Sequence, residues 1–249
     1  MVTKISRSTQ IYWALVVLLS VLTGVNVFLP QVSFLPAVPQ GTPPKLVIAL
    51  ANGIATLIIY GGLGFIGLKL SFLLAIPTLW DSRVSHRQRF VIPALAGIIL
   101  GAFFIVADLM FQQFHDLGAF SHPSFPTSVV VSINAAIGEE IIFRLFLIPF
   151  GAWLISKILL KGVAKTNIFW FVSTISAVTF ALAHLPAVML MFNLQAIHEI
   201  PIALMIEIIL LNGIVSFLAA YYFKSFGFLA AVSLHFWTDV VWHIIWGVF

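Results

Sequence analysis

The sequence contains no cysteine among its 249 residues. This absence excludes disulfide frameworks, thiolate metal sites and a cysteine nucleophile, and with the last of these the cysteine proteases. Charged residues are also scarce: they make up 8% of the chain, whereas soluble domains carry roughly 25%. Because 61% of the residues are hydrophobic, we predict an integral, multi-pass membrane protein.

No stretch alternates apolar and polar residues as a barrel strand does, and we find no internal repeat and no soluble domain. Only helices and closed barrels satisfy their backbone groups in lipid. The predicted fold class is therefore all-α, a polytopic bundle of about seven to eight transmembrane helices. Ionisable residues occur inside several spans, so the bundle should enclose an intramembrane polar cavity.

Apolar runs of membrane-spanning length predict the helices. They cover residues 11–29, 90–112, 127–148, 168–189, 200–223 and 226–248, with a longer run at 45–80. The first run follows Lys4 and Arg7 but is longer than the core of a signal peptide, which has about 7–15 residues, and no small-residue cleavage site follows it. We predict that it is an uncleaved anchor, and that the proline-rich residues 30–44 form a loop.

Two of these runs contain helix breakers. Residues 45–80 are too long for one span and include Gly61, Gly62, Gly64 and Gly67, so they are expected to form either a span with an interfacial helix or two short spans. Pro149 is expected to kink or end the span at 127–148 before an amphipathic continuation.

Basic residues indicate orientation. Outside the spans they fall in alternate loops, with Lys45 as the exception: Lys4 and Arg7, then Arg83, Arg87 and Arg89, then Lys157, Lys161 and Lys165, then Lys224. The positive-inside rule places the N-terminus and these loops in the cytoplasm, and the C-terminus on the other side if there are seven spans. Since the net charge of +4 is scattered in this way, the predicted partner is the lipid bilayer and not nucleic acid.

Residues 128–150 carry three charges inside an apolar run: Glu139, Glu140 and Arg144. A charge near the bilayer centre costs at least ~2.5 kcal/mol, so such residues are kept where they pair or line a wet cavity. Residues four apart share a helix face, which predicts a structural ion pair between Glu140 and Arg144. Glu139 points elsewhere and lacks a local partner.

Two later spans each present a pair of residues four apart. Phe180 and His184 form one pair, and His235 and Asp239 form the other. Isolated polar residues are assigned packing or hydrogen-bonding roles: Asp108, Glu207, Asn212 and His243. His198 and Glu199 lie at a predicted helix start, where an acidic residue favourably meets the helix dipole.

This set of side chains is suited to activating water for attack on a carbonyl. Glu139 or a histidine can accept the proton, and neighbouring donors can stabilise the oxyanion. We therefore expect Glu139, Glu140, His184, His235 and Asp239 to converge on one cavity. A metal alternative stays open: Glu139, His184, His235 and Asp239 are candidate ligands for Zn²⁺, although the chain has no HExxH motif.

Three motifs in successive spans carry a family resemblance: Glu139-Glu140-x-x-x-Arg144, Phe180-x-x-x-His184 and His235-x-x-x-Asp239. In this order they resemble the CAAX protease and bacteriocin-processing (CPBP, Abi) family of intramembrane proteases, which includes the type II CAAX prenyl endopeptidases. The resemblance implies N-terminal transmembrane helices in residues 1–89 and a protease core in residues 90–249.

The resemblance also implies roles. Glu139 would activate water with His184 assisting, Glu140 and Arg144 would be the structural pair, and His235 with the residue four beyond it would hold the oxyanion. Prenyl endopeptidases commonly have asparagine at that last position, whereas this chain has Asp239. An ionised aspartate cannot donate a hydrogen bond, so Asp239 is protonated, orients His235 or binds a metal.

The predicted function is thus an intramembrane endopeptidase acting on a peptide or protein substrate, with either no cofactor or Zn²⁺. Two alternatives remain. One is a non-catalytic family member that serves as a bacteriocin immunity factor or scaffold, and the other is a small proton-coupled transporter. The short basic loops would fit a bacterial inner (cell) membrane protein.

Overall fold

The computed structural model describes residues 6–30, 41–160 and 165–249. Within these ranges the chain is helical and contains no strand. The α-helices are α1 (Arg7–Asn26), α2 (Lys45–Leu73), α3 (Ile92–Phe111), α4 (Thr127–Glu140), α5 (Ile148–Trp153), α6 (Lys165–Leu182), α7 (Leu185–Met191), α8 (Ile202–Phe226) and α9 (Phe228–Asp239). π-helical segments extend several of them: η1 (Arg87–Val91), η3 (Ile141–Leu147), η4 (Leu154–Leu159) and η6 (Val240–Ile245).

Seven helical stretches in the described ranges are long and apolar enough to cross a membrane. Four of them join adjacent segments into one span: Arg87–Phe114, Thr127–Leu159, Asn167–Met191 and Phe228–Val248. The predicted all-α fold is confirmed, with the lower of the two expected helix numbers. Many large apolar side chains on these helices are exposed, as expected for a surface that faces lipid.

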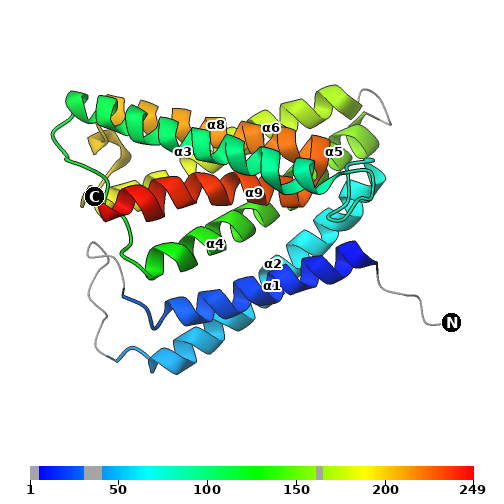
Figure 1. Ribbon diagram of the computed structural model, residues 1–249, viewed down its shortest axis with the longest axis horizontal. Helices are drawn as coiled ribbons and strands as arrows, with labels where there is room; N and C mark the ends of the chain where they lie inside the picture. The colour runs from blue at the N-terminus through cyan, green and yellow to red at the C-terminus, as the bar shows by residue number, and fades with distance from the viewer. Residues whose placement is uncertain (1–5, 31–40, 161–164) are drawn as a thin grey trace.

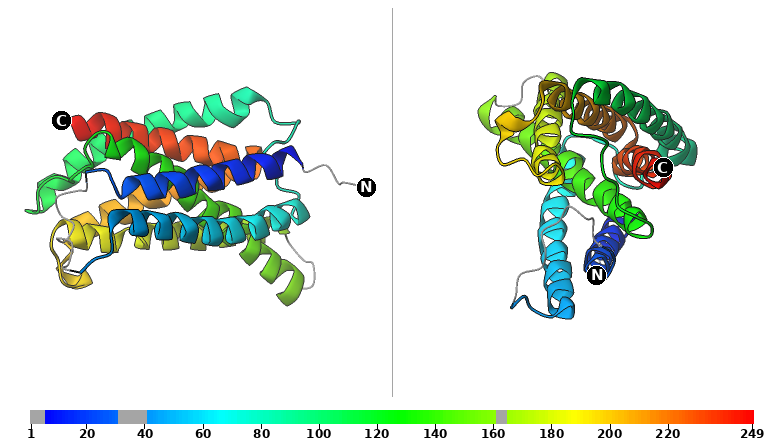
Figure 2. Two further views of the ribbon diagram at one scale, coloured as in Figure 1. Left: turned by 90° about the horizontal axis from the view of Figure 1, so that it is seen from below. Right: turned by 90° about the vertical axis from the view of Figure 1, so that its left-hand side faces the viewer.

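Helix α9 lies inside the bundle (Figure 1) and packs against α3, α4 and α8. Helix α6 covers α8, while α1 and α2 pack on each other and against α4 and η3. The end-on view in Figure 2 shows α1 and α2 side by side, on one side of the remaining helices. This arrangement surrounds the polar residues of α4 and α9 with other helices and keeps them away from lipid.

The expectation that residues 45–80 break into two pieces is wrong, because α2 is one helix from Lys45 to Leu73. Its glycines permit close packing of neighbouring helices. A Cβ atom on Gly64 would lie 2.7 Å from the ring of Tyr12, and Gly67 packs directly on the backbone carbonyl of Leu145 in η3. Small residues at such contacts let helix backbones approach each other in membranes.

Pro149 does not end its helix, which continues through α5 and η4 to Leu159. The proline lies in the first turn of α5, directly after the π-helical segment η3. Its missing N–H is tolerated in a first turn. In an α-helix that N–H would bond to the carbonyl of Leu145, and this is the carbonyl that packs against Gly67.

Basic side chains gather at one end of the bundle. This end carries the start of α1, the turn between α2 and η1, the end of η4 and the turn between α8 and α9 (Figure 1). The opposite end carries the start of α2 with Lys45, the connections before α4 and before α8, and the C-terminus. Lys4, Lys161 and residues 31–40 of the predicted loop lie outside the described residues.

Candidate active site

Glu139 and Glu140 are the last two residues of α4, where the helix passes into η3. Adjacent helical positions point in different directions, and the two side chains differ accordingly. The Glu140 side chain is fully buried, whereas that of Glu139 is 34% exposed. The two carboxylates therefore lie in different environments although they are neighbours in sequence.

Glu140 forms an ion pair with Arg144, whose Nε lies 3.1 Å from Glu140 Oε2. Both side chains are fully buried, and the guanidinium also lies 4.5 Å from the centre of the Phe180 ring. Phe180 is the first residue of the Phe180-x-x-x-His184 motif, so the ion pair contacts α6 directly. Stacking on an aromatic ring further stabilises a buried guanidinium.

The second carboxylate oxygen of Glu140 positions His235. Oε1 accepts a hydrogen bond from His235 Nδ1 at 2.9 Å. The opposite ring nitrogen, Nε2, lies 3.8 Å from Glu139 Oε2 and 3.7 Å from Asp239 Oδ1. Glu140 thus joins Arg144 to His235 and directs Nε2 towards the other two carboxyl groups.

His184 lies at the junction of α6 and α7, a break that divides the helix expected at residues 168–189. Its Nδ1 is 2.8 Å from the carbonyl oxygen of Phe180. A carbonyl can only accept, so Nδ1 carries the proton and Nε2 of the neutral ring is left as an acceptor. Pro186 in the first turn of α7 is compatible with the helix restarting at this point.

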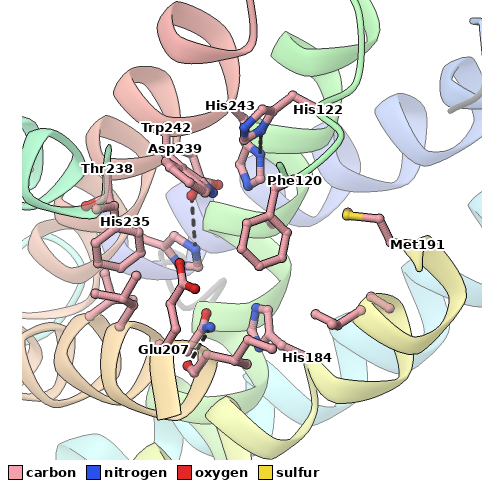
Figure 3. A pocket seen from close by; sticks show the side chains of 18 of the residues that line it. Phe120, His122, His184, Met191, Glu207, His235, Thr238, Asp239, Trp242 and His243 are labelled. Atoms are coloured by element: carbon pink, nitrogen blue, oxygen red, sulfur yellow. Dashed lines mark hydrogen bonds and ion pairs between the residues drawn. The ribbon is translucent and has the colours of Figure 1, made fainter. Parts of the chain in front are cut away.

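These side chains face one cavity of about 220 Å³. Glu139 from α4, His184 from the α6–α7 junction, and His235 and Asp239 from α9 all line it. Figure 3 shows His184, His235 and Asp239 around the same space. Glu140 does not line the cavity: the expectation that it would do so is wrong, because its two oxygens are turned to Arg144 and to the far side of the His235 ring.

The cavity also includes polar residues for which the sequence suggested only packing roles: Glu207, Asn212 and His243. Figure 3 shows Glu207 reaching from α8 towards the space between His184 and His235. Its carboxyl group also interacts with that of Asp108 on α3. His243 could have been found from the sequence, because it continues the spacing of four set by His235 and Asp239. Asp108 lies outside the cavity lining and accepts a hydrogen bond from Gln112 at 2.6 Å.

His122, which the sequence gave no reason to select, completes this wall from the connection before α4. Its Nδ1 lies 3.1 Å from Nδ1 of His243, so one ring donates and the other accepts. Burial lowers the pKa of His122 to about 4. His122 is therefore neutral at physiological pH, in agreement with a hydrogen bond between two imidazoles.

A metal centre needs several ligand side chains directed at one point. Among residues 6–30, 41–160 and 165–249, no group of three histidine, aspartate or glutamate side chains is arranged to hold a metal ion. His184 and His235 each use one ring nitrogen for a protein hydrogen bond. Their second nitrogens, together with Glu139 and Asp239, do not form a ligand set for Zn²⁺ as they are placed here.

Comparison with known proteins adds one result. Residues 121–241 match the family model described as type II CAAX prenyl endopeptidase Rce1-like. The matched region contains all three motifs and lies within residues 90–249. No curated protein and no solved structure matches the chain.

Proposed function

Because residues 121–241 form a domain of the type II CAAX prenyl endopeptidase Rce1-like family, we propose that this integral membrane protein is an intramembrane endopeptidase that hydrolyses a peptide bond of a peptide or protein substrate. The family assignment confirms the resemblance based on the three motifs. The observation that carries the proposal is that Glu139, His184, His235 and Asp239 line one cavity although they come from three separate parts of the chain: α4, the α6–α7 junction and α9.

In this proposal Glu139 is the general base. Its carboxylate is the part-exposed member of the glutamate pair and faces the cavity. A water between Glu139 and the substrate carbonyl would give its proton to the carboxylate and attack the carbonyl carbon. The unprotonated Nε2 of His184 would accept a hydrogen bond from the same water and so orient it. Glu139 would then return the proton to the leaving amine.

His235 and Asp239 would stabilise the oxyanion of the tetrahedral intermediate. Nδ1 of His235 donates to Glu140, so a donor at Nε2 requires the imidazolium form. The carboxylates of Glu139 and Glu140 lie within 4 Å of the ring nitrogens and would stabilise that form. Asp239, in its protonated form, would be the second donor at the place where prenyl endopeptidases commonly have asparagine.

We propose that this chemistry uses no metal ion. What supports a mechanism with glutamate and histidine alone is that, in the described part of the chain, no three of the histidine, aspartate and glutamate side chains are placed to hold one metal ion. The alternative is testable with a chelator. Activity that disappears with chelator and returns with Zn²⁺ would replace this mechanism with a metal-dependent one.

The test is cleavage of a fluorescence-quenched peptide library by the purified full-length protein in lipid nanodiscs, with products identified by mass spectrometry. Glu139→Gln keeps the shape of the side chain and removes the base, so we expect activity to fall by ~10²–10⁴-fold with unchanged membrane abundance. Full activity of Glu139→Gln would contradict its role. A wild-type protein that cleaves nothing would favour the non-catalytic immunity or scaffold alternative.

A further inference from the structure

The cavity occupies only one half of the bundle. Helix α4 begins at Thr127, and Glu139, its deepest residue in the lining, lies twelve residues, or about 18 Å, further along the axis. On α8, which begins at Ile202 at the same end, the lining extends no further than Val215. Helix α9 runs in the opposite direction, and its lining residues begin only at His235.

The other half of the bundle is filled by a packed apolar cluster. Its members from η3, α8 and α9 include six residues that are at most 1% exposed: Ile141, Leu145, Ala219, Phe223, Phe228 and Leu234. Protein interiors packed in this way leave few voids larger than a water molecule. This cluster separates the floor of the cavity from the end of the bundle at which α9 begins.

The cavity mouth lies at the end where α4 and α8 begin. Phe120, Ser121 and His122 from the connection before α4 line it, together with Met191 at the end of α7. Ser121 is exposed. The two connections at this end, residues 112–126 and 192–201, contain no Lys or Arg.

The sealed end carries most of the basic residues that flank the spans. Those in the described ranges are Arg7, Arg83, Arg87, Arg89, Lys157 and Lys224, whereas Lys45, at the start of α2, lies at the opposite end. Loops rich in Lys and Arg remain in the cytoplasm during membrane insertion. The charge distribution and the position of the cavity are independent observations, and together they relate the mouth to one side of the membrane.

We propose that the cavity opens on the non-cytoplasmic face, so that the site is reached by peptide segments presented from that side of the membrane. The orientation stands on the fold and the charges alone, whereas the substrate class also rests on the proposed protease function. The fitting class is an exported peptide or the non-cytoplasmic segment of a membrane protein. Its apolar side chains would contact the apolar part of the lining: Phe104, Phe120, Val188, Met191, Leu211 and Trp242.

The absence of cysteine from the chain makes a direct test possible. Single cysteines are introduced in the full-length protein as Ser121→Cys at the mouth, Ser124→Cys on the same connection but outside the cavity lining, and Ser82→Cys at the basic end. All three serines are exposed. Intact cells are treated with a charged, membrane-impermeant maleimide before and after permeabilisation.

We expect Ser121→Cys and Ser124→Cys to be labelled in intact cells and Ser82→Cys only after permeabilisation. Asn212→Cys, inside the cavity, should react with a small water-soluble methanethiosulfonate added from outside. Labelling of Ser82→Cys in intact cells, or protection of both cysteines at the mouth end, would overturn the orientation. Protection of Asn212→Cys would overturn access to the cavity from that side.

Peptide cleavage separates this inference from the proposed function. Right-side-out vesicles should cleave a quenched peptide added to the medium, and inverted vesicles should not. Cleavage by inverted vesicles alone would overturn the inference while supporting the protease. If neither preparation cleaves while labelling is as expected, the protease proposal fails and the orientation stands.

Discussion

At the scale of single residues, Glu140 makes more of the site's contacts than its neighbour although it does not face the cavity. One of its oxygens is 3.1 Å from Arg144 and the other accepts from His235. The carboxylate therefore neutralises a buried guanidinium and also fixes the direction of an imidazole. Among the described residues, Glu139 has His235, at 3.8 Å, as its ion-pair partner within 4 Å, a longer contact than either of those made by Glu140.

Glu140→Gln should consequently lose stability where Glu139→Gln does not. The substitution leaves Arg144 as a buried charge without a carboxylate, a defect that costs about 3–5 kcal/mol when such pairs are broken. We expect low membrane abundance and a lowered thermal melting temperature in detergent. The matched control is Glu139→Gln, and melting temperatures that fall equally in both variants would contradict this division of roles.

Asp239 provides a second contrast between substitutions. Asparagine keeps a hydrogen-bond donor near Nε2 of His235, whereas alanine removes it. Removal of one oxyanion donor costs ~10²–10³-fold in rate, so we expect that loss for Asp239→Ala and clearly higher residual activity for Asp239→Asn. Peptide cleavage by both purified variants measures this. An equal loss in both, partly restored by added Zn²⁺, would instead favour a ligand role.

At the scale of elements, α2 packs closely against η3 because the residue at the contact has no side chain. Gly67 packs on the carbonyl of Leu145, while a Cβ atom on Gly62, five residues earlier, would have none of the described residues within 4 Å. Both glycines belong to the same helix, but Gly62 is exposed and Gly67 is buried. Only at Gly67 do the neighbouring atoms leave no room for a side chain.

Gly67→Ala should separate α2 from η3 and destabilise the protein by about 1–3 kcal/mol, as overpacking does. Gly62→Ala should be neutral or stabilising by roughly 0.5–1 kcal/mol, because alanine is the better helix former. Thermal unfolding of both variants in the same detergent tests the difference. Similar melting temperatures for the two would show that the contact is unimportant.

At the scale of the whole molecule, α1 and α2 support a site to which they contribute no cavity residue. The family model begins at residue 121, yet Tyr12 and Gly64 pack on Ile141, the residue that follows Glu140. Tyr12 also donates hydrogen bonds to the carbonyls of Tyr60 and Gly61, each at 2.7 Å. The segment that carries the glutamates is thus buried partly by the N-terminal helices.

Residues 90–249 expressed alone should therefore accumulate poorly in membranes, because the faces of α4 and η3 would lose their partners. Co-expression of residues 1–89 as a separate chain should restore part of the abundance. Immunoblotting of membrane fractions measures both. Normal abundance and activity of residues 90–249 alone would show that the predicted division at residue 90 separates independent domains.

The sequence by itself determined the helical membrane fold and which residue types could do chemistry, because hydropathy and a spacing of four are local properties. It could not decide whether the glycines of α2 break the helix or let it pack closely against its neighbours, since that depends on what lies opposite Gly64 and Gly67. It assigned Glu207 only a packing or hydrogen-bonding role and did not select His122, because their importance comes from sharing a cavity with residues distant in the chain. The end of the bundle at which that cavity opens was decided only by the tertiary packing of η3, α8 and α9.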